Sequence, residues 1–509
     1  MAVTNHPRKQ FLPPPWARRG KLRLAHVPGG PSETARLVLS GEWDGSPAAL
    51  LSTSRYDPVL VPELVANGIN AVALTWSPGF SHEGDQAQWE IVKRLLPLLK
   101  KKRIKAIAHI VAASDLATLL PEAQPLPITP PSPQSAGSNT PPNAKPHRCA
   151  MDIGIPSWRA YVACKMRAAM EAGFDGLFVD VAAADFSSGA EHLKQLWAEA
   201  ASGRAADAPE LLFYTRGWCS PALDDVCNLK LLEPGLAPGA GTGAAFNTNL
   251  ARLKLAYEQG GRDKPFAAEL AARGLTEKQR RLSAAEILAS GGTCAELDLP
   301  GDYGAFLQNC GGLFMPGDPV GAIGVIVSDE ILQGGPGPAQ FLDSLVGASI
   351  QFDLIPLAQF ERFDLRKYKL LIAAGLAPVP EPLEKALNLF VNEHGGTTYI
   401  TPGPSPEELQ ASLIPGIRVS AGPQPVEVQA PEGVVALLWG KGTKRWVHLL
   451  NYRDEPCEAH ITLPGCGGRR LDAYSPDEAP LTLNILEAGA GCATFALSGI
   501  QTYAVVAVV

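Results

Sequence analysis

Polar side chains that could do chemistry recur where apolar segments of this chain end. Leu177–Val179 is an apolar run without alternation, and it is followed by Asp180. Such a run is typical of a parallel strand that is buried on both faces. A polar or aromatic residue closes the other apolar runs in the same way, at His26, Trp76, His109, Tyr214, Glu233, Glu269 and Glu296. We expect these side chains to share one rim, because α/β barrels place their chemistry at the carboxyl ends of their strands.

Several carboxylates and aromatic rings on one rim are the composition expected of a carbohydrate site. Cleavage of a glycosidic bond needs two carboxyl groups, one protonated and one that acts as a nucleophile or activates water. We expect Asp180 to be the nucleophile. Glu233 is the expected acid/base, since Leu232 and Pro234 give it a partly apolar setting of the kind that raises a carboxyl pKa. Glu269 is the third catalytic candidate, and with Glu296 it competes for either role.

The expected substrate-binding residues come from the other strand ends and the loops that follow them: Trp76, His82, His109, Tyr214, Arg216, Trp218 and Glu296. Two alternatives remain open. One is a carbohydrate-binding barrel that has lost its chemistry. The other is a metal-assisted hydrolase that uses His26, His109 and Asp180, although the sequence contains no HExxH or HxxxH motif. We expect no cofactor and no resident metal.

The elements that must position these residues alternate regularly. In Ser157–Val181, apolar side chains recur at helical spacing up to Met170, Gly173 is placed to end the helix, and a strand follows. The sequence predicts eight such strands, at residues 21–27, 69–76, 104–110, 176–180, 211–215, 228–232, 265–270 and 293–297. Helices between most of them predict a (β/α)8 TIM barrel over residues 1–318, with a Pro-rich insertion near 121–146.

Two smaller domains are predicted after the barrel. Residues 319–405 alternate strands and helices as a small doubly wound α/β domain would. Residues 406–509 contain short alternating strands separated by turn residues, which predicts an antiparallel β-sandwich. The length of 509 residues fits several domains, because a single core stops growing well below that size.

Charge and composition exclude some classes of protein. The net charge of −7 provides no basic excess for phosphates, which argues against a general nucleic-acid binder. The sequence has no stretch of about 18 apolar residues, so we expect no membrane span. The nine cysteines are scattered and form no CxxC pair. Together with the absence of a signal-peptide pattern, this predicts a cytoplasmic protein in a reducing compartment.

The order of barrel, doubly wound domain and β-sandwich resembles the trimeric β-galactosidases and related barrel glycosidases. Their middle domain looks like a glutamine amidotransferase that has lost its chemistry, and Phe363–Thr401 is similar to that domain. Ala373-Ala374-Gly375 stands where an amidotransferase carries its nucleophilic cysteine. The resemblance therefore implies a glycosidase without amidotransferase activity. It also implies a homo-oligomer, a dimer or a trimer.

Two barrel segments, Thr75–Asp85 and Ser157–Val181, look like the barrels of α-L-fucosidases and α-galactosidases. In that resemblance the nucleophilic Asp at the end of the fourth strand maps onto Asp180. Val181 stands where many relatives have Asn, and the Asn-Glu pair that β-galactosidases carry on strand four is absent. The resemblance implies a glycoside hydrolase, retaining in mechanism, that acts on a small oligosaccharide or glycoside.

Overall fold

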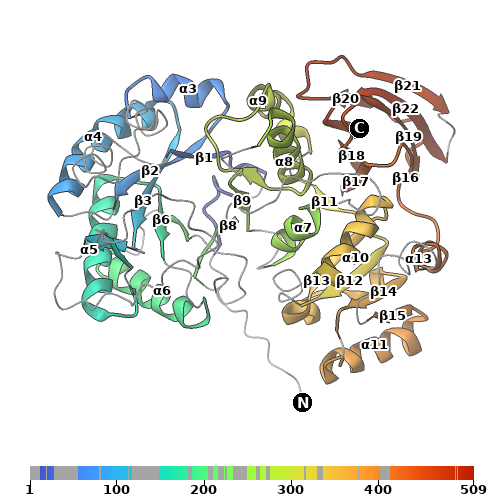
Figure 1. The fold of residues 1–509 in the computed structure, drawn as a ribbon, viewed down its shortest axis with the longest axis horizontal. Helices are drawn as coiled ribbons and strands as arrows, with labels where there is room; N and C mark the ends of the chain where they lie inside the picture. Colours follow the sequence, from blue (N-terminus) through green and yellow to red (C-terminus); the bar gives the residue numbers. More distant parts are fainter. Residues whose placement is uncertain are drawn as a thin grey trace, which may run out of the picture. The chain divides into compact units, whose positions relative to one another are not determined.

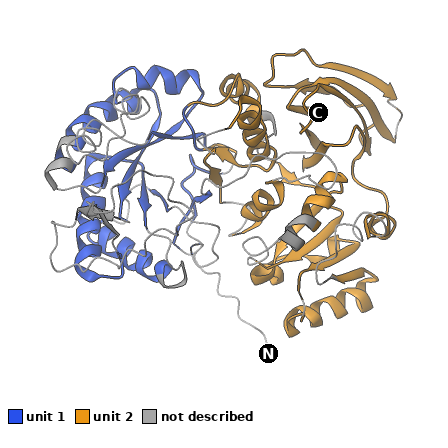
Figure 2. Ribbon diagram, viewed as in Figure 1, with its two compact units in different colours: residues 1–18, 22–232, 295–297 blue, residues 19–21, 233–294, 298–509 orange. Residues whose placement is uncertain are grey.

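The protein is represented by a computed structural model, in which two compact units are distinguished (Figure 2). The first unit comprises residues 1–18, 22–232 and 295–297, and the second comprises residues 19–21, 233–294 and 298–509. The structure describes residues 12–18, 20–27, 56–78, 82–112, 114–116, 148–150, 152–181, 186–204, 210–215, 223, 226–232, 249–259, 264–270, 275–314, 317–328, 336–376, 378–401, 413–487, 489 and 491–509. The predicted insertion at 121–146 lies outside these residues.

A parallel sheet forms the centre of the first unit (Figure 1). Its strand order is β1-β2-β3-β6-β7, and every neighbouring pair is parallel. The strands are β1 (Leu24–Val27), β2 (Ala71–Ser77), β3 (Lys105–Val111), β6 (Gly176–Asp180) and β7 (Leu212–Tyr214). The unit also contains β4 (Ser114–Leu116), β5 (Arg148–Ala150), β8 (Lys230–Leu232) and the helices α3 (Leu60–Ala66), α4 (His82–Lys101), α5 (Pro156–Ala172) and α6 (Phe186–Ala201).

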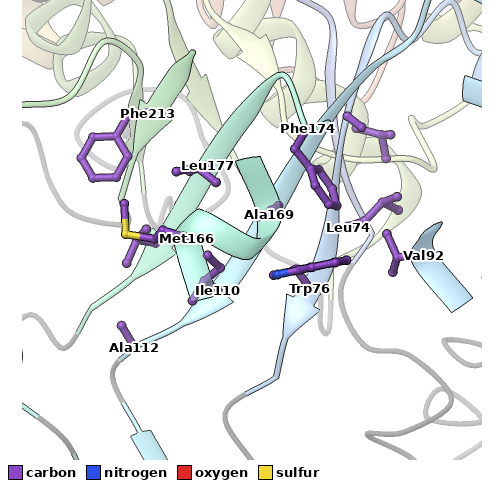
Figure 3. Close-up of a cluster of buried hydrophobic side chains, with 14 of the residues drawn as sticks. Leu74, Trp76, Val92, Ile110, Ala112, Met166, Ala169, Phe174, Leu177 and Phe213 are labelled. Atoms are coloured by element: carbon purple, nitrogen blue, oxygen red, sulfur yellow. The ribbon is translucent and has the colours of Figure 1, made fainter. Parts of the chain in front are cut away.

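The apolar core of this unit lies between the sheet and its helices. Figure 3 shows Leu74, Ile110 and Leu177 of the strands close to Met166 of α5 and Val92 of α4. The helix predicted in Ser157–Val181 is confirmed as α5. It ends where Gly173 adopts the left-handed conformation, with φ 92°, and donates its N–H to the Met170 carbonyl at 3.1 Å.

The second unit continues the strand–helix alternation and then changes character. It begins with α7 (Leu250–Glu258), β9 (Phe266–Ala268), α8 (Glu277–Ala289), β10 (Thr293–Cys294) and α9 (Tyr303–Phe314). β9 and β10 pair in parallel. Thr276 caps α8 in a capping box with Gln279. The strands β1, β2, β3, β6, β7, β8, β9 and β10 correspond to the eight predicted barrel strands, although several are shorter than expected.

A doubly wound sheet follows, with strand order β13-β12-β14-β15 and only parallel neighbours. Its elements are β12 (Ile323–Val327), α10 (Pro336–Gly347), β13 (Phe352–Pro356), the short helices η5 (Leu357–Arg362) and η6 (Leu365–Lys367), β14 (Leu370–Ala374), α11 (Glu381–His394) and β15 (Thr397–Thr401). The left-handed Gly395, with φ 64°, ends α11 before the last strand.

Two antiparallel sheets form the C-terminal part, in the orders β11-β17-β18-β23-β20 and β16-β19-β22-β21. Their strands are β11 (Asp318–Pro319), β16 (Glu427–Gln429), β17 (Val434–Lys441), β18 (Lys444–Asn451), β19 (Cys457–Pro464), β20 (Leu471–Tyr474), β21 (Thr482–Glu487), β22 (Cys492–Ile500) and β23 (Tyr503–Val508), preceded by α13 (Ile414–Ala421). A shared apolar core confirms the predicted β-sandwich. The boundaries 1–318, 319–405 and 406–509 stay a prediction. Among the described helices, none has the length and apolar character that a bilayer crossing requires.

Candidate active site

A stack of aromatic rings fills the inner face of the first unit's sheet. His109 of β3, Phe178 of β6 and Tyr214 of β7 are paired across the sheet, so their side chains share one face. The ring centroids of His109 and Phe178 are 4.5 Å apart, and those of Phe178 and Tyr214 are 4.8 Å apart with an interplanar angle of 6°. This face is opposite the helix-packed core, so it is the interior of the curved sheet.

His26 of β1 reaches the same stack from the other edge of the sheet. Its Nε2 lies 3.0 Å from Tyr214 Oη, and its ring lies 5.0 Å from Phe178. β1 and β7 are the two ends of the five-stranded order, so this hydrogen bond spans the interior. The two edges of the sheet therefore come close enough for side chains of β1 and β7 to meet.

Asp180 lies above this stack. It is the last residue of β6, and alternation along the strand puts its side chain on the same inner face as Phe178. The side chain is 18% exposed, and its Oδ2 lies 3.7 Å from Nε2 of His109, whose side chain is 12% exposed. His109 Nε2 has no hydrogen-bond partner within the described part of the chain.

Glu296, in the last of the eight predicted barrel strands, also lies at this site. It pairs with His26 as an isolated parallel bridge, and the His26 N–H donates to the Ala295 carbonyl at 3.3 Å. The half-buried Glu296 therefore occupies the strand position next to β1, on the side away from β2. The number of strands between Glu296 and Asp180 equals the number between His26 of β1 and Tyr214 of β7. The structure thus brings together His26, His109, Asp180, Tyr214 and Glu296 around one interior.

Trp76 is not part of this interior, contrary to the expectation that it binds substrate. Its indole is 1% exposed and lies in the core between sheet and helices (Figure 3). It stacks on Trp89 of α4 at 4.7 Å and meets the edge of Phe174 at 5.2 Å. The side chain points to the opposite face from His109, so we assign it to the core.

The remaining predicted site residues cannot be compared with this geometry. Glu233, Arg216 and Trp218 lie outside the described residues, and His82 begins α4 but its side chain is not described. Glu269 follows β9 in the second unit, where it is half-buried. The expectation that these residues catalyse or bind substrate stays a prediction.

Phe178 is the member of the site that the sequence did not single out. It contacts His26, His109 and Tyr214, and so it forms the floor beneath Asp180. An aromatic residue within an apolar run is usually a core residue, which conceals such a role. The available signal was its position two residues before Asp180, which places both side chains on one face of the strand.

The described residues contain no group of three or more His, Cys, Asp or Glu side chains arranged to hold a metal ion. This includes the set of His26, His109 and Asp180 that the metal-assisted alternative requires. His26 instead bonds to Tyr214, and its ring is packed on Phe178. The metal-assisted alternative therefore has no support among the described residues.

Comparisons with known proteins show that the similarity lies in the fold. No protein-family model and no curated protein sequence matches the chain. Among solved structures, α-L-fucosidase isoenzyme 2 from Paenibacillus thiaminolyticus is 11% identical, with 88% of this chain and 95% of that chain covered and a TM-score of 0.65. A GH42 β-galactosidase from G. stearothermophilus is 10% identical, with coverages of 96% and 98% and a TM-score of 0.62.

The β-galactosidase from Rahnella sp. R3 gives a similar result, at 11% identity, coverages of 95% and 98% and a TM-score of 0.58. At this identity the likeness shows the fold alone. It confirms the predicted fold class, a (β/α)8 barrel followed by further α/β and antiparallel β domains, and its resemblance in architecture to β-galactosidases and α-L-fucosidases.

Proposed function

We propose that this protein is a glycoside hydrolase that cleaves a glycosidic bond in a small oligosaccharide or glycoside. The observation that carries the proposal is the position of Asp180, a partly exposed carboxylate at the carboxyl end of an inner barrel strand, above a floor of aromatic rings. This is the edge at which barrels of this class perform chemistry. The likeness in fold to a fucosidase and to β-galactosidases supports the same reaction class.

In the proposed mechanism, Asp180 acts at the anomeric carbon and a second carboxyl group protonates the leaving oxygen. If Asp180 is a nucleophile, it forms a covalent glycosyl–enzyme intermediate that water then hydrolyses, with retention of configuration. His109 flanks the reacting carboxylate, with its Nε2 at 3.7 Å from Asp180 Oδ2. Tyr214 and His26 hold one another in place beneath the reacting sugar.

The second carboxyl group is Glu296, Glu233 or Glu269. Glu296 has support from the geometry of the first unit, because its bridge to His26 places it on the rim across from Asp180. Glu233 follows β8 and Glu269 follows β9, so both also fit the carboxyl ends of barrel strands. Substitution of each by Gln, assayed on the same substrate, distinguishes the three.

Asp180→Asn tests the proposed role most directly. With a panel of aryl glycosides, we expect the substitution to lower kcat/KM at least about a hundredfold on any substrate that the wild type cleaves, since the reacting carboxylate is lost. Asp57→Asn, a change of the same kind at an exposed position outside the site, should leave the rate unchanged. Undiminished hydrolysis by Asp180→Asn would remove Asp180 from the mechanism.

The alternative is a carbohydrate-binding barrel that has lost hydrolysis. The observation that favours it is Val181, which follows Asp180 where many similar barrels carry a polar Asn, and which is 8% exposed within the apolar core. Saturable binding of a sugar without turnover of any glycoside in the panel would support this alternative against the hydrolase.

Two coarser expectations also remain proposals. We propose that the chain forms a homo-oligomer, a dimer or a trimer, and that it works in the cytoplasm. The first rests on the resemblance of the predicted middle domain to that of the trimeric β-galactosidases, and the second on nine scattered cysteines with no CxxC pair in the sequence. Light scattering of the purified chain measures the oligomeric state.

A further inference from the structure

The turn between β17 and β18 in the β-sandwich carries basic side chains without acidic partners. Lys441 ends β17 and Lys444 begins β18, and the two are directly opposite each other across the hairpin. Both are exposed, and within the described part of the chain neither ammonium group has a hydrogen-bond or ion-pair partner. Like charges at directly opposite positions destabilise a hairpin, so this pair has a cost that no local contact offsets.

Two arginines lie at the same turn and are fixed by its backbone. Arg445 donates from Nη1 to the Gly442 carbonyl at 2.7 Å and to the Lys444 carbonyl at 2.8 Å, and Arg469 donates from Nη1 to the Thr443 carbonyl. A guanidinium carries five N–H groups, so each arginine keeps further donors for an anion. We call these side chains the hairpin cations: Lys441, Lys444, Arg445 and Arg469.

The charge around the hairpin is positive even when the nearby acids are counted. β17 and β18 contain no Asp or Glu. On the two strands paired with them, the acidic groups are Asp318 of β11 and the carboxylate of Val509 after β23. Asp472 of β20 is paired with Arg470 at 3.0 Å, so this pair adds no net charge. The four hairpin cations therefore concentrate anions locally, in a chain of net charge −7.

Other exposed cations of the described chain have a structural explanation that the hairpin cations lack. Lys93 and Lys385 pair with Glu90 and Glu381 of their own helices. The basic run at residues 100–103 ends α4, where positive charge is stabilised by the negative end of the helix dipole. The hairpin has neither an acidic partner nor a helix end, so binding of an anion from outside the chain accounts best for its charge.

The surroundings of the hairpin cations suit a polar polyanion. Gly442 and Thr443 form the tip of the turn, and Trp446, next to Arg445, is only 2% exposed. Proteins that bind single-stranded nucleic acid present aromatic rings for stacking, and proteins that lie on bilayers insert apolar side chains. The hairpin presents neither. Carboxylates along a sugar chain need only ammonium charges and guanidinium forks.

We propose that the hairpin cations dock an acidic polysaccharide, a sugar chain that carries carboxylates along its length. The choice of a polysaccharide among polyanions rests on the proposed glycosidase function, whereas the charge of the hairpin does not depend on it. None of the hairpin cations belongs to the candidate active site. Docking of the polymer is therefore a separate event from cleavage of a glycosidic bond.

Isothermal titration calorimetry with polygalacturonate tests the proposal, with fully methyl-esterified polygalacturonate as the matched neutral polymer. We expect saturable binding of the acidic polymer to the full-length protein at low salt and binding of the ester at least about tenfold weaker, because only carboxylates pair with the cations. Raising the salt concentration should weaken binding, since the hairpin cations are largely exposed. No saturable binding, or equal affinity for the two polymers, would overturn the proposal.

Two double variants with the same change of net charge locate the binding surface. Lys441→Gln with Lys444→Gln should weaken polygalacturonate binding about tenfold or more, whereas Lys101→Gln with Lys102→Gln at the end of α4 should change it less than about twofold. The urea midpoint of the hairpin variant should not fall, because a like-charge pair is removed. Equal weakening by the two variants, or a destabilised hairpin variant, would contradict the proposal.

Two further probes distinguish the acidic polysaccharide from other polyanions. A 20-base-pair DNA duplex and vesicles of phosphatidylserine should bind more weakly than polygalacturonate, because the net charge of −7 opposes phosphate-dense surfaces. Tighter binding to either probe would overturn the choice of a polysaccharide. The hairpin variant should hydrolyse aryl glycosides as the wild type does. A failure of the glycosidase proposal would appear only in that assay, so it is distinguishable from a failure of docking.

Discussion

At the scale of single residues, two buried carboxylates show how differently this protein stabilises charge. Asp85 of α4 forms an ion pair with Lys165 of α5, and Ser77 Oγ donates to it at 2.7 Å. Among the residues that the structure describes, the donors to Glu286 of α8 are neutral: the Asn249 backbone and side-chain amides and Tyr452 Oη at 2.7 Å. Burial without a cation raises the pKa of Glu286 to about 7.

The raised pKa of Glu286 predicts a pH-dependent stability. Between its ordinary pKa of 4.5 and about 7, the folded protein binds a proton that the unfolded chain releases. Stability should therefore fall as the pH rises through this window, by on the order of 3 kcal/mol if Glu286 acts alone. Urea unfolding measured from pH 5 to pH 8 tests this.

Glu286→Gln is the matched variant for that measurement. A glutamine cannot ionise, so this substitution should remove the part of the pH dependence of stability that belongs to Glu286. The stability of the variant relative to that of the wild type should therefore increase as the pH rises. Parallel stability curves for the two proteins would contradict the expectation.

At the scale of elements, β6 is shaped by a glycine at its first position. A Cβ on Gly176 would lie 2.8 Å from the Leu212 carbonyl oxygen and 2.9 Å from Leu212 Cβ, so β6 and β7 approach more closely than any larger residue allows. Gly189 in α6 is different, because a Cβ there would meet nothing within 4 Å. The two glycines have different physical reasons to be present.

Alanine at these two positions should have opposite effects. Gly176→Ala should lower the free energy of unfolding by roughly 1–3 kcal/mol, because β7 must move away. Gly189→Ala should raise it by up to about 1 kcal/mol, since alanine loses less backbone entropy in a helix. Urea midpoints measure both, and a destabilised Gly189→Ala or an unchanged Gly176→Ala would contradict this interpretation.

Helix α5 and the strands were predictable because their signals are local. The spacing of Trp158, Val162 and Met166 and the stop at Gly173 all lie within one segment. The direction of Trp76 was not predictable, because β2 is buried on both faces and has no alternation to separate them. A register irregularity between Thr75 and Ser77 adds to this difficulty.

The assembly of the candidate site depended on contacts over long sequence separations. The bond between His26 and Tyr214 joins residues 188 positions apart, and no local pattern indicates it. The sequence did place Asp180, His109, Tyr214 and Glu296 at strand ends. Barrel geometry then accounts for their convergence, because parallel strands bring their carboxyl ends to one rim.

At the scale of the whole molecule, the second unit joins barrel helices to both later domains. Lys254 Nζ of α7 donates to the Phe352 carbonyl at 2.8 Å, where β13 of the doubly wound sheet begins. Trp439 Nε1 of β17 donates to the Ala289 carbonyl of α8 at 2.8 Å, and Tyr452 reaches Glu286 of the same helix. Residues 233–294 thus pack with the C-terminal half of the chain.

These contacts predict that a barrel expressed as residues 1–318 is not self-sufficient. Without the later domains, α7 and α8 would expose apolar surface and Glu286 would lose Tyr452. We expect the truncated chain to aggregate or to melt at a lower temperature than the full chain, as gel filtration and a thermal scan would show. A monodisperse fragment that melts with the full chain would contradict this.

The bridge between β1 and residues 295–296 joins segments that are synthesised at different times. His26 is synthesised about 270 residues before the Ala295 carbonyl that it bonds to. At about 5–20 residues per second, a ribosome needs roughly a quarter of a minute to a minute to supply that partner. Throughout this interval the outer edge of β1 lacks this neighbour. A parallel sheet that forms from the first strands during synthesis therefore keeps an open edge at β1 until residues 295–296 have been made.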